Sequence, residues 1–286
     1  MDIFGLAIRF WKLLGRLWEV MGRKQISLIA AGVAFFGMFA VFPGIAAVIA
    51  IFGLLADPTV VSEQLVLMED IIPRDAYDLF AVQIARLLAA RTEALGWATI
   101  VSIALALWSS RAGVAALMGG LNAIAGTPPR NGFWQAIVAL GLTICLVALA
   151  ITALLAVVVT PVILAFVPLA GSTAWLLEGL RWTIALGVLL LALGLLYRFG
   201  PAGTGVRGRW FTIGAFCVVI LWIGASAGLS YYLTNFASYN EVYGSIGAVI
   251  GLLLWLYVSA YLILLGAVLN SLIHSRSASA DAPYIA

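Results

Sequence analysis

Long apolar segments separated by short polar ones dominate the pattern of the chain. The clearest apolar segment covers residues 243–271, which exceeds the roughly 20 residues that a helix needs to cross the hydrocarbon core of a bilayer. Gly247 and Gly251, near its start, leave one helix face flat enough for a neighbouring helix to approach closely. We expect this segment to be a membrane span that packs against protein.

Five further apolar segments are predicted to cross the membrane, at about 26–56, 94–110, 133–160, 175–197 and 210–236. The stretch 131–177 carries no charge, and its break at Pro161 favours one crossing followed by an interfacial segment, with two crossings as the alternative. Pro43 interrupts the first span and Gly244 precedes the last, so these two residues and Pro161 are the predicted helix breaks.

Three other segments have patterns of their own. In residues 1–24 apolar side chains recur at helical spacing with cations between them, which predicts an interfacial amphipathic helix on the cytoplasmic face. The acidic and apolar residues of 57–93 predict a helical loop outside the cytoplasm, and the small polar residues of 275–286 predict a disordered tail. Residues 1–274 are thus expected to form a single transmembrane helical domain.

Composition supports the same fold class, an all-α polytopic membrane bundle. Hydrophobic residues make up 64% of the chain and charged residues 9%, against roughly 25% charged residues in soluble domains. The two cysteines, Cys145 and Cys217, both lie in apolar segments, so no disulfide is expected.

The distribution of cations predicts the topology. Cytoplasmic loops carry an excess of Lys and Arg, and a model with six spans and both termini in the cytoplasm places eleven of the fifteen cations inside. Splitting 131–177 into two crossings would move the loop with Arg207 and Arg209 to the outside. Six spans are therefore preferred.

Several stretches together resemble the YihY/BrkB family of bacterial inner-membrane proteins, once mislabelled as ribonuclease BN. The matching pieces are AAGVAFFGMFAVFPG in the first span, LNAI at 121–124, LLYRFGP at 195–201, GAF at 214–216 and YGSIGAVIGLLLWLYVSAYLILLGAVLN at the end. The resemblance covers nearly the whole chain and implies an inner-membrane location and a role as a transporter or lipid-handling protein. Where the family commonly has GAE this chain has Gly266-Ala267-Val268, so a carboxylate suited to a proton or cation is absent.

Nuclease chemistry is excluded by the residue types present. A zinc-dependent nuclease needs a cluster of His and Asp ligands, and the chain has one histidine, His274. We therefore expect no enzyme activity, no metal, no cofactor and no nucleic-acid partner; membrane lipids are the expected partners.

The basic residues at the inner ends of the spans are candidates for binding anionic groups. Arg111 could reach into the bundle and hold a phosphate, or it could be a topology-setting cation that extends to the interface. The loop beginning at Gly200, flanked by Arg198, Arg207 and Arg209, could bind an anionic headgroup with its cations and backbone amides, or it could be a positive-inside loop only.

Polar and aromatic residues gather at the outer ends of the last two spans. They include Tyr231, Asn235, Tyr239, Glu241, Tyr243 and Ser245. Free amides of a helix that starts near Gly244 could face an anion there, and the alternative is an interfacial aromatic belt. Asn122, after the second span, is a further candidate, as a cavity wall or as a helix cap.

Two functions are compatible with this pattern. Broken helices near the middle of the membrane are typical of transporters and favour a transporter or lipid flippase for an amphipathic or anionic substrate. The alternative is a non-transporting scaffold that assembles as a homo-oligomer, or with other envelope proteins, through the small-residue faces at Gly224/Gly228 and Gly247/Gly251.

The six-span topology predicts opposite accessibility for two loops. In a chain with Cys145 and Cys217 replaced by alanine, Asp75→Cys should react with a membrane-impermeant thiol reagent in intact cells, whereas Thr204→Cys should not. Reaction at both positions would contradict the six-span topology.

Overall fold

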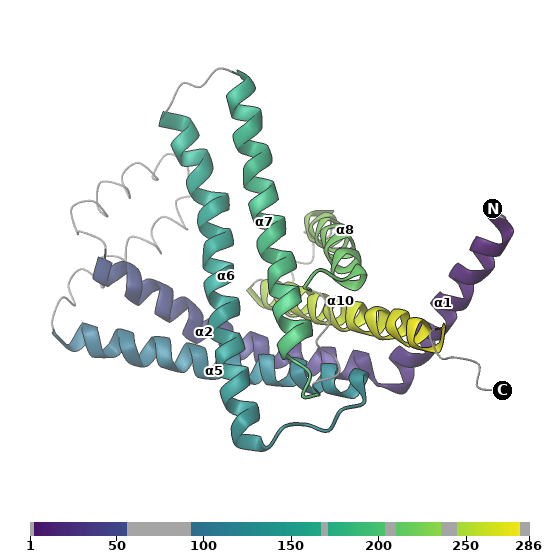
Figure 1. The fold of residues 1–286 in the computed structure, drawn as a ribbon. Coiled ribbons are helices and arrows are strands. Elements are labelled where there is room, and N and C mark those ends of the chain that lie inside the picture. The colour runs from purple at the N-terminus through teal and green to yellow at the C-terminus, as the bar shows by residue number, and fades with distance from the viewer. Residues whose placement is uncertain (1–2, 56–92, 167–170, 204–209, 236–244, 281–286) are drawn as a thin grey trace. The chain divides into compact units, whose positions relative to one another are not determined.

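The computed structural model describes residues 3–55, 93–166, 171–203, 210–235 and 245–280 (Figure 1). The helices in these ranges are α1 (Ile3–Arg23), α2 (Ile26–Leu55), α5 (Glu93–Ala125), α6 (Gly132–Phe166), α7 (Gly171–Phe199), α8 (Ile213–Asn235) and α10 (Ser245–Ala280). No strand occurs within them. Long apolar segments form helices because a helix satisfies its own backbone hydrogen bonds in hydrocarbon, where water cannot.

Five of the described helices contain stretches long and apolar enough to cross a membrane. These stretches are Ile103–Ala125, Gly132–Ala153, Gly179–Phe199, Ile213–Tyr232 and Val249–His274. The apolar stretch found in α2, Ile26–Ala40, is shorter than these five. Large apolar side chains such as Ile220, which is 69% exposed, lie on the outside of these helices, as expected of lipid-facing surfaces.

The all-helical, multi-pass class is thus confirmed. The count of six spans and the cytoplasmic position of both termini stay predictions. The extracytoplasmic loop predicted for 57–93 lies outside the described residues apart from Glu93, where α5 begins.

Neither predicted proline break ends its helix. α2 continues past Pro43 to Leu55, where a kink or a break within one span was predicted, and the kink stays a prediction. α6 continues past Pro161 to Phe166, so a helix end at Pro161 was a wrong prediction. Proline removes one hydrogen bond, whereas ending a helix in hydrocarbon would leave several backbone groups without partners. α6 is accordingly one helix where an interfacial segment was expected after residue 160. Gly244 lies outside the described residues, directly before the start of α10.

α10 is longer than the sequence pattern indicated. It extends to Ala280, six residues into the segment predicted as a disordered tail, and the residues after it lie outside the description. The side chains at 275–279 include three serines and one arginine, which lower helix propensity only slightly at the end of a helix that is already formed.

The chain divides into two compact units, residues 1–38 with 111–286 and residues 39–110. The second unit contains the later part of α2 and the earlier part of α5. All packing and polar contacts described below lie within the first unit. A single domain over 1–274 stays a prediction.

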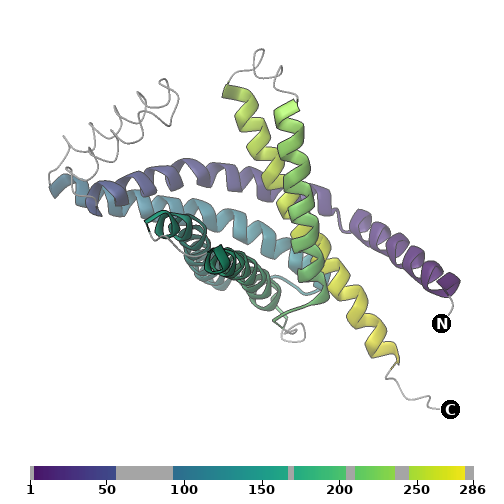
Figure 2. The ribbon, with the colours of Figure 1, turned by 90° about the horizontal axis from the view of Figure 1, so that it is seen from above.

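In the first unit, α8 packs along α10 and α6 packs along α7 (Figures 1 and 2). The start of α2 and the end of α5 meet α10 at Gly120, where an added Cβ would lie 2.9 Å from Ile29 and 2.8 Å from Leu264. Leu121 reaches Gly200 at the end of α7.

α8 and α10 approach most closely at a pair of glycines. A Cβ added to Gly214 would collide with the carbonyl oxygen of Gly266 and would lie 2.5 Å from Asn270 Oδ1. A Cβ added to Gly266 would collide with Val218 and lie 2.5 Å from the hydroxyl of Tyr197. Only glycine at these two positions permits this helix–helix distance.

The glycine contact predicts a position-specific loss of stability. Gly214→Ala should lower the free energy of unfolding by about 1–3 kcal/mol, because the new methyl group forces the backbones of α8 and α10 apart. Gly228→Ala, on the same helix, is the matched control, because no described atom lies within 4 Å of its added Cβ. Thermal unfolding in detergent should show a lower midpoint for Gly214→Ala alone; equal midpoints would contradict the packing.

Candidate functional site

Asn122, predicted as a cavity wall or a cap, anchors two chain segments at the end of α5. The residue is 3% exposed, and its Oδ1 accepts hydrogen bonds from the backbone N–H of Ala202 at 2.7 Å and from Thr127 Oγ1 at 3.2 Å. Its backbone carbonyl accepts from Thr127 N–H at 3.1 Å, after Gly126 turns the chain with φ at 68°. Asn122 thus lies inside α5, three residues before the helix ends, and its side chain holds the segment after α7.

The amide nitrogen of the Asn122 side chain is not held by a comparable hydrogen bond. Nδ2 is buried and finds no hydrogen-bond partner among the described residues. An unsatisfied buried donor costs about 1–3 kcal/mol, so the two bonds at Oδ1 hold the side chain in place against this penalty.

Arg130 binds the end of α7 from the α5–α6 connection. Its Nη1 donates to the carbonyl of Gly200 at 2.9 Å, and its Nη2 donates to those of Phe199 at 3.1 Å and Pro201 at 2.6 Å. A guanidinium at this position satisfies carbonyls that the helix leaves open and complements the negative end of the helix dipole. Partial burial lowers the pKa of Arg130, and the group remains charged at neutral pH.

We call Asn122, Thr127, Arg130 and the backbone of 199–202 the junction. Within it the carbonyls of three loop residues face Arg130, and the N–H of Ala202 is bound by Asn122. The described part of this loop therefore binds the protein itself, and it presents carbonyl oxygens where amides for an anionic headgroup were predicted.

Of the three arginines that flank the loop, the structure describes Arg198. Arg198 lies over the rings of Trp210 at 5.0 Å and Phe199 at 5.9 Å, distances that permit cation–π attraction. Arg207 and Arg209 lie outside the described residues, so headgroup binding by the loop stays a prediction.

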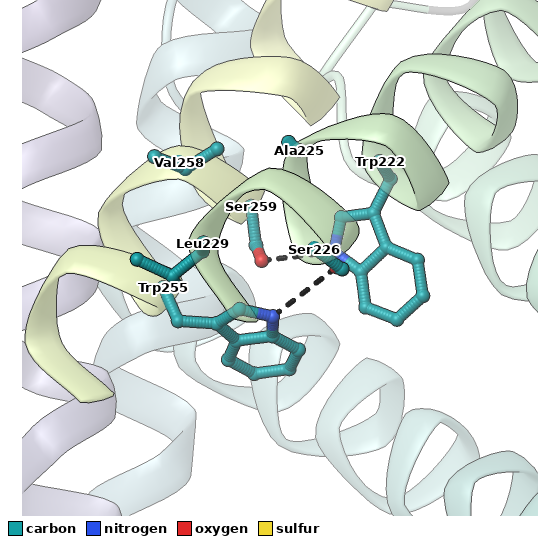
Figure 3. A pocket seen from close by; sticks show the side chains of 7 residues that line it. All are labelled: Trp222, Ala225, Ser226, Leu229, Trp255, Val258 and Ser259. Atoms are coloured by element: carbon teal, nitrogen blue, oxygen red, sulfur yellow. Dashed lines mark hydrogen bonds between the residues drawn. The ribbon is translucent and has the colours of Figure 1, made fainter. Parts of the chain in front are cut away.

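A second polar group lies between α8 and α10, and we call it the Trp–Ser seam (Figure 3). Trp222 Nε1 donates to Ser259 Oγ at 3.0 Å, and Trp255 Nε1 donates to Ser226 Oγ at 3.4 Å. The two indole rings meet edge to face with centroids 5.7 Å apart. A cavity of about 20 Å³ between the four residues is large enough for one water molecule.

Tyr197 and Asn270 bind backbone groups around the close contact of Gly214 and Gly266. The Tyr197 hydroxyl donates to the carbonyl of Ile263 at 2.8 Å. Asn270 Oδ1 accepts from Gly214 N–H at 2.9 Å, and its Nδ2 donates to Thr212 Oγ1 at 2.9 Å. The Asn270 bonds satisfy polar groups at the start of α8, where helix amides lack intrahelical partners, and the Tyr197 bond joins α7 to α10.

Arg111 lies inside an apolar stretch, whereas the sequence pattern had placed it at the end of a span. α5 runs unbroken from Glu93 to Ala125, and its apolar stretch Ile103–Ala125 includes Arg111. The helix continues because the residues after Arg111 are small or apolar helix formers. The side chain of Arg111 is half-buried.

The predicted outer cluster lies mostly outside the description. Tyr231 is 71% exposed on α8, Asn235 is the last residue of that helix, and Ser245 is the first residue of α10. Tyr239, Glu241 and Tyr243 are among the residues that the structure does not describe. An anion site there stays a prediction.

Sequence reasoning counted Arg130 only as a positive charge and missed Tyr197, Asn270 and the Trp–Ser seam. A signal for the seam is present, because α8 and α10 both contain Trp followed four residues later by Ser. In antiparallel helices this shared spacing places each Trp opposite the other helix's Ser. Arg130 has no comparable signal, since its acceptors lie 69 to 71 residues away.

Metal binding has no support in the described ranges. No group of three or more His, Cys, Asp or Glu side chains there could hold a metal ion. Val268, which stands where the family commonly has a carboxylate, is 0% exposed and belongs to the apolar core.

Five described helices with apolar stretches of spanning length define a polytopic α-helical membrane protein. The chain belongs to the family described as Virulence factor BrkB, whose profile matches residues 17–284. The predicted family resemblance is thereby confirmed, and the protein is a multi-pass protein of the bacterial inner membrane.

Three relatives illustrate the family. YfkH of Bacillus subtilis (strain 168), named as ribonuclease-like, is 38% identical over 102 residues, covering 36% of this chain and 37% of that protein. A UPF0761 membrane protein of Tolumonas auensis is 36% identical over 92 residues, 32% of this chain and 29% of its own. UPF0761 membrane protein XAC0937 of Xanthomonas axonopodis pv. citri is 40% identical over 98 residues, 34% of this chain and 23% of its own.

These matches span well under half of each relative's length. No solved structure was found to match the chain.

The junction predicts a specific effect of removing the Asn122 side chain. Asn122→Ala should lower the free energy of unfolding by about 1–3 kcal/mol and speed hydrogen exchange at the amide of Ala202, which loses its acceptor. Asn131→Ala is the control, because Asn131 is exposed and its described hydrogen bond uses the backbone carbonyl. Unchanged exchange at Ala202 in Asn122→Ala would contradict the anchoring role.

Proposed function

We propose that this protein is a transporter or lipid flippase that moves an amphipathic substrate with an anionic group across the inner membrane. The observation that supports the proposal is the position of Arg111, a half-buried cation inside the apolar stretch Ile103–Ala125. An ionisable residue within a membrane span is costly and commonly belongs to a substrate or ion pathway. A guanidinium binds phosphate or carboxylate with two parallel hydrogen bonds, which favours an anionic headgroup.

The surroundings of Arg111 fit a place where helices can separate. Two residues further along α5, a Cβ added to Gly113 would lie 3.6 Å from the backbone nitrogen of Gly37 on α2. Gly37 in turn faces Leu256 of α10, where an added Cβ would lie 3.6 Å from a methyl group. Arg111 is therefore two residues from a contact of α5, α2 and α10 at which two glycines let the α2 and α5 backbones approach closely.

Nuclease activity is not part of the proposal. The relative named as ribonuclease-like shares 102 aligned residues with this chain, and the whole chain contains a single histidine. A metal-dependent phosphodiesterase site needs several convergent ligands, so the residue types of this chain favour a role without such chemistry.

A scaffold function is the second candidate, and one observation favours it. Gly224 and Gly228 are exposed on α8, with no described atom within 4 Å of an added Cβ at either position. Such a face lets another helix approach closely, as in assembly with a second copy. At the other predicted face, Gly251 is buried. The scaffold candidate thus depends on α8.

The proposed function predicts that Arg111 is sensitive to shape as well as charge. Arg111→Lys should slow transport of a fluorescent phosphatidylglycerol in proteoliposomes by about tenfold, because Lys keeps the charge but cannot form the two-bond fork. The control is Arg207→Lys with Arg209→Lys, which should transport as the wild type does if those cations act by charge alone.

Three outcomes separate the candidates. Wild-type activity of both variants would identify Arg111 as a topology-setting cation and contradict the proposed role. If Arg111→Lys and the double loop variant slow transport equally, the loop arginines do not act by charge alone, and Arg111 is not set apart by its shape. No transport by the wild-type protein, together with an oligomer that Gly224→Leu dissolves, would favour the scaffold.

A further inference from the structure

α1 separates its charges from its apolar residues more sharply than any other described helix. Arg9, Lys12, Arg16, Glu19 and Arg23 follow one another at steps of three or four residues and so share one side of the helix. The side chains of Lys12, Arg16, Glu19 and Arg23 are described, and all four are exposed. Three cations and one carboxylate give this side a net positive charge.

The apolar side of α1 is divided between two environments. Leu17, Val20 and Met21 pack into the core cluster of the first unit, where Met21 is 5% exposed. This contact holds the second half of α1 against the bundle, and α1 contacts α10 there.

The rest of the apolar side is not covered by described residues. Trp18 is 75% exposed, Trp11 is 71% exposed, Ile8 is 53% exposed and Leu14 is 38% exposed. Trp11 and Trp18 are seven residues apart, so that they lie on the same side of the helix two turns apart. We call these four residues the tryptophan edge.

We propose that the tryptophan edge of α1 binds the headgroup layer of an anionic lipid bilayer, to which the charged side with Lys12, Arg16 and Arg23 adds electrostatic attraction. Tryptophan favours this layer because its ring is apolar and its N–H can bind water or headgroups. The cations on the charged side complement anionic lipid within the range of surface electrostatics, and each adds about fivefold to membrane binding. An anionic bilayer therefore fits both the apolar and the charged parts of this surface.

The position of α1 in the chain supports the same occupant. α2 begins at Ile26, three residues after the end of α1, and Gln25 between them adopts a left-handed backbone with φ at 51°. Its carbonyl accepts from Leu28 N–H at 3.1 Å, so the chain changes direction at this turn and enters an apolar helix at once. The end of α1 therefore lies at the level where the chain enters the membrane. This inference is independent of the transport proposed above.

The experiment measures which side of α1 faces lipid in the full-length protein. With Cys145 and Cys217 replaced by alanine, single cysteines are introduced as Trp18→Cys, Trp11→Cys and, as the control on the charged side, Arg16→Cys. Each carries a nitroxide label, and the protein is placed in phosphatidylcholine bilayers with or without phosphatidylglycerol. Oxygen, which concentrates in lipid, and a water-soluble nickel complex compete to relax the label.

Labels at positions 11 and 18 should be relaxed more by oxygen than by nickel, and the label at position 16 should show the reverse. Equal water exposure at 11, 16 and 18 would overturn the inference, as would dipolar coupling between labels at position 18, which would show a second copy on this edge. Two tryptophan positions are tested so that a folding defect in one variant does not decide the result.

To test the role of the cations, Lys12→Gln and Arg16→Gln are combined in the protein that carries the nitroxide label at position 18. Adding phosphatidylglycerol should increase the oxygen-to-nickel ratio in the parent chain, and the double variant should lose most of this response. The same response in both chains would overturn the role of the cations.

Discussion

Where Gly214 of α8 meets Gly266 of α10, two helix backbones pass each other with no side chain between them. Hydrocarbon surrounds both helices, so little hydrophobic driving force holds them together, and close packing and interhelical hydrogen bonds must supply the attraction. Tyr197 and Asn270 can bind backbone atoms of this contact only because the glycines bring those atoms within reach. The start of α8, the end of α10 and the end of α7 are therefore positioned by one small contact.

The junction extends this arrangement to the remaining helices at the same end. Arg130 ties the start of α6 to the end of α7, and Asn122 ties the end of α5 to the segment that follows α7. Each bond joins a side chain at the end of α5 or just after it to the backbone at the end of α7 or just after it. The described parts of these connections are thus part of the packed structure, where the sequence pattern indicated a positive-inside loop or a headgroup-binding loop.

The helices were largely predictable from sequence, and the polar contacts were not. The segment predicted at 210–236 forms α8 at Ile213–Asn235, because an apolar segment in a membrane has almost no alternative to a helix. The same physics explains the error at Pro161, where local propensity favours a break and the solvent opposes one. Asn122 was identified as a candidate cap from its position, whereas its bond to Ala202, 80 residues away, depends on tertiary packing that no local pattern encodes.

The two bonds of the Trp–Ser seam restrict how the bundle can move. Sliding α8 along α10 by one helical turn would remove both indole donors from their serines at once, and hydrocarbon offers neither donor a replacement. A rearrangement that moves α8 and α10 together keeps both bonds, whereas one that slides α8 along α10 must break them.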